Sequence, residues 1–163
     1  MKIEELIQEF NRAAGLEEVP AADGVWKFSA DGAVFGVSAD EAGEKVYLFG
    51  EIPSPVPDKD EAFRKTVLEA NYFFNGTGGA TFSINPETGA YTLIAAERLD
   101  RLAPESFFAF VEKFVNTLAT WKAIALSAEA SPTSSDSGES AAREPDDGGL
   151  DRNRIDEGGF LRV

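Results

Sequence analysis

The sequence predicts an α+β fold in the order α-βββ-α-ββ-α, with helices packed on an antiparallel twisted sheet and a disordered C-terminal tail. Three observations lead to this prediction. Apolar residues recur with helical spacing in three segments, strand-like segments fall into two groups joined by short turns, and the composition changes sharply after Ser127. The chain of 163 residues is long enough for one domain with a proper core, assigned to residues 1–127, followed by a tail at 128–163.

The first half of the domain is predicted to be a helix followed by a three-stranded meander. Gly15 is a typical helix stop, and Asp31-Gly32 is typical of a tight hairpin turn between strands 25–30 and 33–38. A third strand is expected at 45–50. The apolar residues with helical spacing before Gly15 are Ile3, Leu6, Ile7, Phe10 and Ala14.

Prolines separate this half from the next. Segment 51–57 contains three prolines, which cannot donate ladder hydrogen bonds, so it is predicted to be a connector and not a helix or central strand. Asp58 and Glu61 then resemble a capping box that opens a second helix, expected to end near Asn75-Gly76.

The second half is predicted to be a hairpin followed by a long helix. Segments 80–85 and 91–95 alternate between apolar and polar residues around a turn at 86–89. Pro104 suits the first turn of a helix that runs to about Ser127. The apolar stripe of this helix is wider than a surface helix needs, and its centre consists of Phe107, Val111, Phe114, Leu118, Trp121 and Ala125.

The tail at 128–163 is rich in Ser, Asp, Glu, Gly, Pro and Arg, and Phe160 is its only aromatic residue. Such a segment buries too little apolar surface to offset the entropy of ordering it, so we expect disorder. Its last residues, Leu161-Arg-Val163, could serve as a peptide ligand that adds a strand to another protein's sheet.

Composition excludes several function classes. The chain has no Cys and no His, which removes disulfides, thiol nucleophiles, Cys/His zinc sites and imidazole catalysis. The net charge of −14 argues against nucleic acid and against anionic membrane surfaces. The N-terminal segment is amphipathic and acidic, unlike a signal peptide. We therefore expect a cytoplasmic protein that is not an enzyme and that uses no cofactor or metal.

The segment Asn75-Gly-Thr-Gly-Gly79 superficially resembles a phosphate-binding loop. Phosphate loops lead from a strand into a helix N-terminus, whereas here a helix ends before the glycines and a strand follows. The helix would present its negative end to the loop, and no Lys or Arg lies between Lys65 and Arg98. The glycines are therefore interpreted as a helix stop and chain reversal.

The domain contains more large apolar residues than one small five-stranded sheet can cover. Twelve Phe, two Trp and three Tyr lie in residues 1–127. A second subunit or an apolar client would cover the excess, so we expect a homodimer.

Several short motifs occur in an order typical of one protein family. The motifs are Gly15-Leu16, Asp23-Gly24, Phe49-Gly-Glu-Ile-Pro53, Leu68-Glu-Ala-Asn71, Thr77-Gly-Gly-Ala80, Leu93, Leu99-Asp-Arg-Leu102 and Trp121. Through them, about residues 3–126 resemble the class I chaperones of type III secretion systems, the family that includes the Tir chaperone. Family members usually end soon after the last helix, so the resemblance leaves the role of the tail open.

The resemblance implies a homodimeric chaperone that binds the N-terminal segment of a secreted effector without ATP and keeps it soluble and competent for export. The client groove is expected on the first helix and the meander, at Ile3, Phe10, Val25, Phe35 and Val37. The dimer contact is expected on the second helix and the following hairpin, at Phe63, Val67, Phe74, Phe82 and Ile84. For each set the competing interpretation is ordinary core. The main alternative function is a small α+β interaction domain that binds a folded signalling partner.

Overall fold

The structure is a computed structural model that describes residues 2–18, 20–30, 32–54 and 60–130. The chain divides into a unit of residues 1–132 and a unit of residues 133–163, and only the first contains described residues. The predicted disorder of the tail therefore lies outside the described residues, apart from three positions, because the last helix continues to Ala130.

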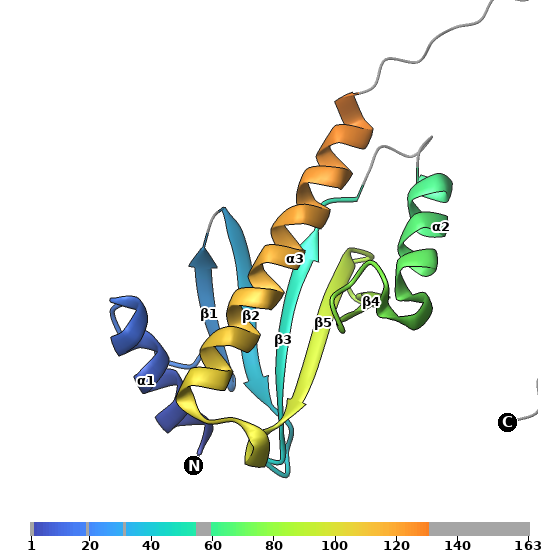
Figure 1. Cartoon of the computed structure of the whole chain (residues 1–163). Coiled ribbons are helices and arrows are strands. Elements are labelled where there is room, and N and C mark those ends of the chain that lie inside the picture. The colour runs from blue at the N-terminus through green and yellow to red at the C-terminus, as the bar shows by residue number, and fades with distance from the viewer. Residues whose placement is uncertain (1, 19, 31, 55–59, 131–163) are drawn as a thin grey trace, which may run out of the picture. The chain divides into compact units, whose positions relative to one another are not determined.

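The α+β prediction is confirmed, and the helices and strands follow the predicted order with two short 3₁₀ turns added (Figure 1). The elements are α1 (Ile3–Ala14), β1 (Val25–Ala30), β2 (Ala33–Ala39), β3 (Lys45–Ile52), α2 (Asp60–Asn71), η2 (Tyr72–Phe74), β4 (Thr81–Ile84), β5 (Tyr91–Arg98), η3 (Leu99–Arg101) and α3 (Pro104–Ala130).

Helix α1 ends where the sequence predicts. Gly15 adopts a left-handed φ of 67°, which costs glycine little because it lacks a Cβ atom. The N–H of Leu16 then donates to the carbonyl of Asn11 at 2.9 Å, which satisfies one of the carbonyls left free by the helix end. The Gly15-Leu16 step is therefore a C-terminal cap.

The five strands form one antiparallel sheet in the order β1-β2-β3-β5-β4. Strands β1 and β4 are the two edge strands. Strand β3 pairs with β5, although α2, η2 and β4 lie between them in the sequence. The sequence-based end of β3 at Gly50 is wrong, because Glu51 and Ile52 pair with Thr92 and Tyr91. These two residues keep their backbone N–H groups, and only Pro53 ends the ladder.

All three helices pack on the same face of the sheet. Helix α3 lies across this face, with α1 beside β1 and α2 near β4 and β5 (Figure 1). Phe114 of α3 packs on Phe35, and the side chain of Leu118 occupies the space above Gly50, where an added Cβ would lie 2.5 Å from it. The predicted stripe of α3 is confirmed as core, since all six of its central residues are buried.

A side-chain amide fixes β4 to α2. Asn71 accepts a hydrogen bond from the N–H of Phe82 (2.8 Å) and donates one to the carbonyl of the same residue (3.2 Å). The ring of Phe82 packs edge-on against Trp121, whose indole N–H donates to the carbonyl of Gly76 at 2.8 Å. Gly78 and Gly79 have φ of 60° and 96°, as expected of a chain reversal.

Helix α2 ends earlier than the sequence predicts. It ends at Asn71 and not near Asn75-Gly76, and the turn η2 follows. Phe73 and Phe74 adopt φ of 50° and 57°, a left-handed conformation in which an L-residue is strained. The turn rotates Phe74 away from the apolar stripe of the helix and leaves it exposed.

Replacing Tyr91 with Phe is expected to reduce the sensitivity of the fold to alkaline pH. The hydroxyl of Tyr91 donates to Asp60 at 2.7 Å. Burial, together with this hydrogen bond, raises the pKa of Tyr91 above its ordinary value. A raised pKa in the folded state means that stability is lost as pH rises from about 10 through that pKa.

Denaturant melts at pH 7 and over the range above about pH 10 would check this. At neutral pH, Tyr91→Phe should lower the free energy of unfolding by about 1 kcal/mol, because a hydrogen bond is lost. Above about pH 10, the free energy of unfolding should fall less steeply with pH in the variant than in the wild type. Tyr47→Phe is the control, since Tyr47 points to the opposite face of the sheet. If the free energy of unfolding fell with alkaline pH as steeply in Tyr91→Phe as in the wild type, the role given to the Tyr91 hydroxyl would be wrong.

Candidate partner-binding surfaces

The first candidate site is an apolar surface on α2 and the turn that follows it, called here the α2 surface. Its side chains are exposed although they are large and apolar, with 76% of Phe73 accessible. The Tyr72 and Phe73 rings pack edge-on with centroids 4.6 Å apart. Ile84, at the end of the edge strand β4, is 51% exposed. The members of the α2 surface are Leu68, Tyr72, Phe73, Phe74 and Ile84.

The second candidate site is a groove between α1 and the start of β1, called here the α1–β1 groove. Its volume is about 520 Å³, within the range of ligand-binding clefts. Ile7 and Trp26 give it an apolar floor, and Asn11 adds an amide. Glu4 and Glu18 make its rim acidic.

The groove lies at one end of the free edge of β1. The N–H and C=O groups of Val25 that face this edge are already bonded to Ala22, with both distances 3.0 Å. Because hydrogen-bonding direction alternates along an antiparallel strand, Lys27 and Ser29 direct their backbone groups to the same edge. No strand pairs with β1 on this side within the part of the chain that the structure describes. The edge is therefore a template for an added strand.

The third candidate site is the sheet face opposite the helices. Strand alternation places Val34, Tyr47, Phe49 and Ile94 on this face, and Val34 is 56% exposed. The Phe49 ring lies over Gly36, where an added Cβ would sit 2.4 Å from it. Among the described residues no helix covers this face.

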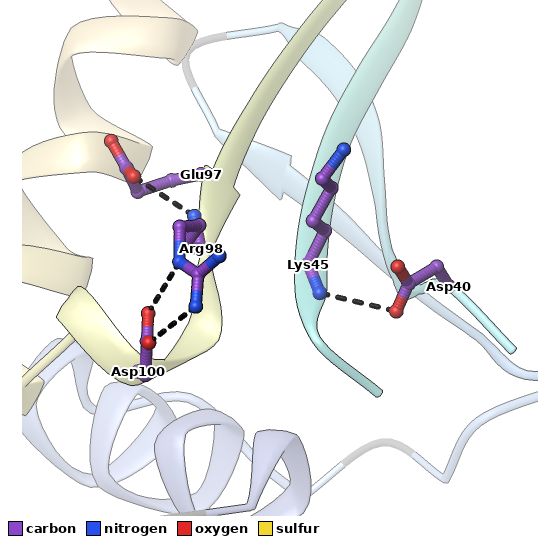
Figure 2. Close-up of polar contacts among 5 residues, drawn as sticks. All are labelled: Asp40, Lys45, Glu97, Arg98 and Asp100. Carbon is purple, nitrogen blue, oxygen red and sulfur yellow. Dashed lines mark hydrogen bonds and ion pairs between the residues drawn. The ribbon is translucent and has the colours of Figure 1, made fainter. Parts of the chain in front are cut away.

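Charged residues lie at one end of the sheet, where their hydrogen bonds stabilise turns (Figure 2). Asp40 accepts hydrogen bonds from the N–H groups of Glu44 (2.7 Å) and Lys45 (3.1 Å), and the Lys45 bond is the main cause of its lowered pKa. Asp100 binds Arg98 through both carboxylate oxygens, at 2.9 and 2.6 Å, which lowers the pKa of Asp100. A carboxylate with a lowered pKa is a poor proton donor near neutral pH.

Two features are absent from the described ranges. No group of three or more acidic side chains is placed to hold a metal ion there. In the same ranges, no helix combines the length and the apolar character needed to cross a membrane.

The residues predicted for client binding do not form one exposed surface. Ile3, Phe35 and Val37 are buried in the core, and Phe10 is half-buried against Phe28 and Phe107. Val25 is half-buried and points to the opposite face of the sheet. Contact with a client stays a prediction for this set. Phe10 and Val25 directly precede Asn11 and Trp26 in the sequence, and these two residues line the α1–β1 groove.

The residues predicted for the dimer contact fall into two groups. Phe63, Val67 and Phe82 are buried, and Phe63 packs on Tyr91 and Trp121. Phe74 and Ile84 are exposed and belong to the α2 surface. Contact with a second subunit stays a prediction for all five.

Sequence reasoning missed Leu68, Tyr72, Phe73 and Asn11. Leu68 and Tyr72 are four residues apart, so they share a helix face, but this second apolar stripe lies beside the stripe taken as core. Asn11 follows Ile3 and Ile7 at intervals of four and is a polar residue in an apolar stripe. This polar residue in an apolar stripe was the sequence signal that could have pointed to Asn11.

The fold and these surfaces define a small α+β domain with helices on one sheet face, exposed apolar side chains near the edge strand β4 and a groove beside the edge strand β1. The model of the Tir chaperone protein (CesT) family matches residues 5–122. The chain therefore belongs to this family. A sequence comparison with curated proteins finds no match.

Solved structures with the same fold are similar to most of the domain. A chain of the HopA1–SchA chaperone–effector complex has a TM-score of 0.63 at 16% identity and covers 74% of this chain and 93% of its own. A chain of the ExsC–ExsE complex has a TM-score of 0.65 at 16% identity, with 77% and 97% covered. A chain of the ExoT–SpcS complex from Pseudomonas aeruginosa has a TM-score of 0.56 at 15% identity, with 71% and 93% covered. At these identities the likeness concerns the fold.

Proposed function

We propose that this protein is a cytoplasmic chaperone that binds the N-terminal segment of a type III secreted effector as a homodimer, without ATP, and keeps it soluble and competent for export. The observation that carries the proposal is family membership across residues 5–122. The solved HopA1–SchA structure is of a chaperone–effector complex, which supports the choice of an effector as partner.

The α2 surface supports the homodimer. It comprises exposed aromatic side chains on η2 and the exposed Ile84 on the edge strand β4. Phe73 and Phe74 are held in strained backbone conformations, and such strain is typical of functional positions. A self-complementary patch on a two-fold axis would cover these side chains.

The opposite edge of the sheet supports client binding. There the α1–β1 groove offers an apolar floor, and the free edge of β1 offers main-chain hydrogen bonds. An extended segment can use both, since edge pairing gives affinity and pockets for alternate side chains give specificity. The net charge of −14 keeps the free chaperone soluble and favours a basic client.

Lys27→Pro is expected to weaken client capture strongly without harming the domain. Proline removes the N–H that Lys27 directs to the free edge, and proline is tolerated on edge strands at such positions. In the source organism, tagged wild-type protein should co-purify a secreted effector, and Lys27→Pro should recover at least about tenfold less of it.

Lys27→Ala is the matched control, because it removes the same side chain and keeps the N–H. If Lys27→Pro recovered as much effector as the wild type, the free edge of β1 would not be part of the client-binding site. Capture of a folded regulator in place of an effector would favour the alternative, a small α+β domain that binds a signalling partner.

A further inference from the structure

Asn11 is a buried polar residue on α1. It lies in the apolar stripe of α1 and is 3% exposed. Within the described residues its Oδ1 atom has no donor in range. Burying an amide oxygen without a partner destabilises a fold, whereas the leucine side chain, which branches at the same atom, buries no polar group and carries no such cost.

The same protein shows what an amide in this setting can do. Asn71 pairs with both the N–H and the C=O of Phe82 and so holds an extended strand against a helix. Asn11 offers the same group from α1, in the wall of the α1–β1 groove. Because χ2 of asparagine is a broad torsion, the amide can turn either edge toward a peptide in the groove.

The position of Asn11 complements the free edge of β1. At Val25 the edge groups of β1 are bonded to Ala22, so a peptide in the groove cannot pair with the strand there. The Asn11 amide supplies a main-chain partner at the end of the edge where β1 supplies none. Glu4 and Glu18 on the rim add negative charge, which favours a peptide with basic side chains.

We propose that the Asn11 amide binds the main chain of an extended, basic segment of the client in the α1–β1 groove, as Asn71 binds the main chain of β4. This inference rests on the proposed chaperone function and adds to it a specificity-determining residue and the chemistry of the bound segment.

The test uses a short synthetic peptide of alternating lysine and valine, acetylated and amidated at its ends, and its N-methylated counterpart. Nuclear magnetic resonance of the full-length protein follows the Asn11 side-chain amide and the Trp26 indole during titration. The unmodified peptide should shift both signals and bind about tenfold more tightly than the N-methylated peptide, which cannot donate a main-chain hydrogen bond. A peptide of alternating glutamate and valine should bind at least about tenfold more weakly.

Asn11→Leu separates recognition from a structural role. The variant should melt about 3 °C higher than the wild type, since it removes an unpaired buried amide oxygen. Its preference for the unmodified lysine peptide should be several-fold smaller than that of the wild type, because only pairing with the free edge of β1 remains. Asn116→Leu, at an exposed position of α3, is the control and should keep the preference for the unmodified peptide.

Three results would overturn the inference. They are a lower melting temperature of Asn11→Leu, a preference for the unmodified peptide that is as large in that variant as in the wild type, and no response of the groove signals to the lysine peptide. Each would leave the chaperone proposal standing if the wild type still co-purifies an effector. Failure of co-purification alongside groove binding would instead overturn the proposed function.

Discussion

Trp121→Ala is expected to lower the free energy of unfolding by about 3–5 kcal/mol, the largest effect of any single change considered for this protein. The indole packs edge-on against Phe63 and Phe82, with ring centroids 6.4 and 4.7 Å away. It therefore joins α3 to α2 and to β4 at one point. Truncation leaves a cavity among these rings and also removes the donor to the Gly76 carbonyl.

Urea unfolding measures this loss, and the protomer concentration is kept fixed because the stability of the proposed dimer would depend on it. Trp121→Phe keeps an aromatic ring but not the N–H, and it should cost only about 1–2 kcal/mol. A similar loss in both variants would mean that the hydrogen bond to Gly76, and not the packing, dominates the contribution of Trp121.

Phe73→Asp is expected to convert the proposed homodimer into a monomer, with the dissociation constant raised at least about 100-fold. The substitution places a charge in the middle of the α2 surface, where it would be buried without a partner in the dimer. The monomer should keep its fold, because Phe73 is 76% exposed and aspartate tolerates left-handed backbone better than phenylalanine does. Light scattering and sedimentation at micromolar concentration would measure the change.

Val34→Asp is the matched control for Phe73→Asp. Val34 is also an exposed apolar residue, 56% accessible, but it lies on the open sheet face at the β1–β2 hairpin. It should leave the dimer intact. A wild-type protein that is monomeric at micromolar concentration would refute the dimer, and dissociation by both variants would place the contact elsewhere. Phe63→Asp and Val67→Asp are unsuitable tests, since both side chains are buried in the single chain.

The elements of the fold could be predicted from the sequence because local patterns determine them. Gly15 ends α1 through its left-handed φ, and β1 pairs with β2 as predicted, up to Ala30 opposite Ala33. The β3–β5 pairing could not be predicted in the same way, because no local pattern specifies which strands meet across α2. The extension of β3 to Ile52 depends on that pairing.

The surfaces were harder to predict because an apolar residue at helical spacing can belong to a core or to an interface. Phe63 and Val67 turned out to be core, whereas Phe74 is exposed because α2 ends at Asn71 and the next turn changes direction. The strain at Phe73 has no signature in the sequence. Asn11 did have one, as a polar residue in an apolar helical stripe, and the structure was needed to show that its oxygen has no partner among the described residues.

The strand order has a consequence for avidity. Strands β1 and β4 are the two ends of a single sheet, so a dimer built through β4 would leave both β1 edges on the outside. A client long enough to reach from one edge to the other would bind the second site at an effective concentration set by the length of its own linker. Two weak grooves could then hold one client firmly, and each could release its segment in turn when the client is pulled from one end.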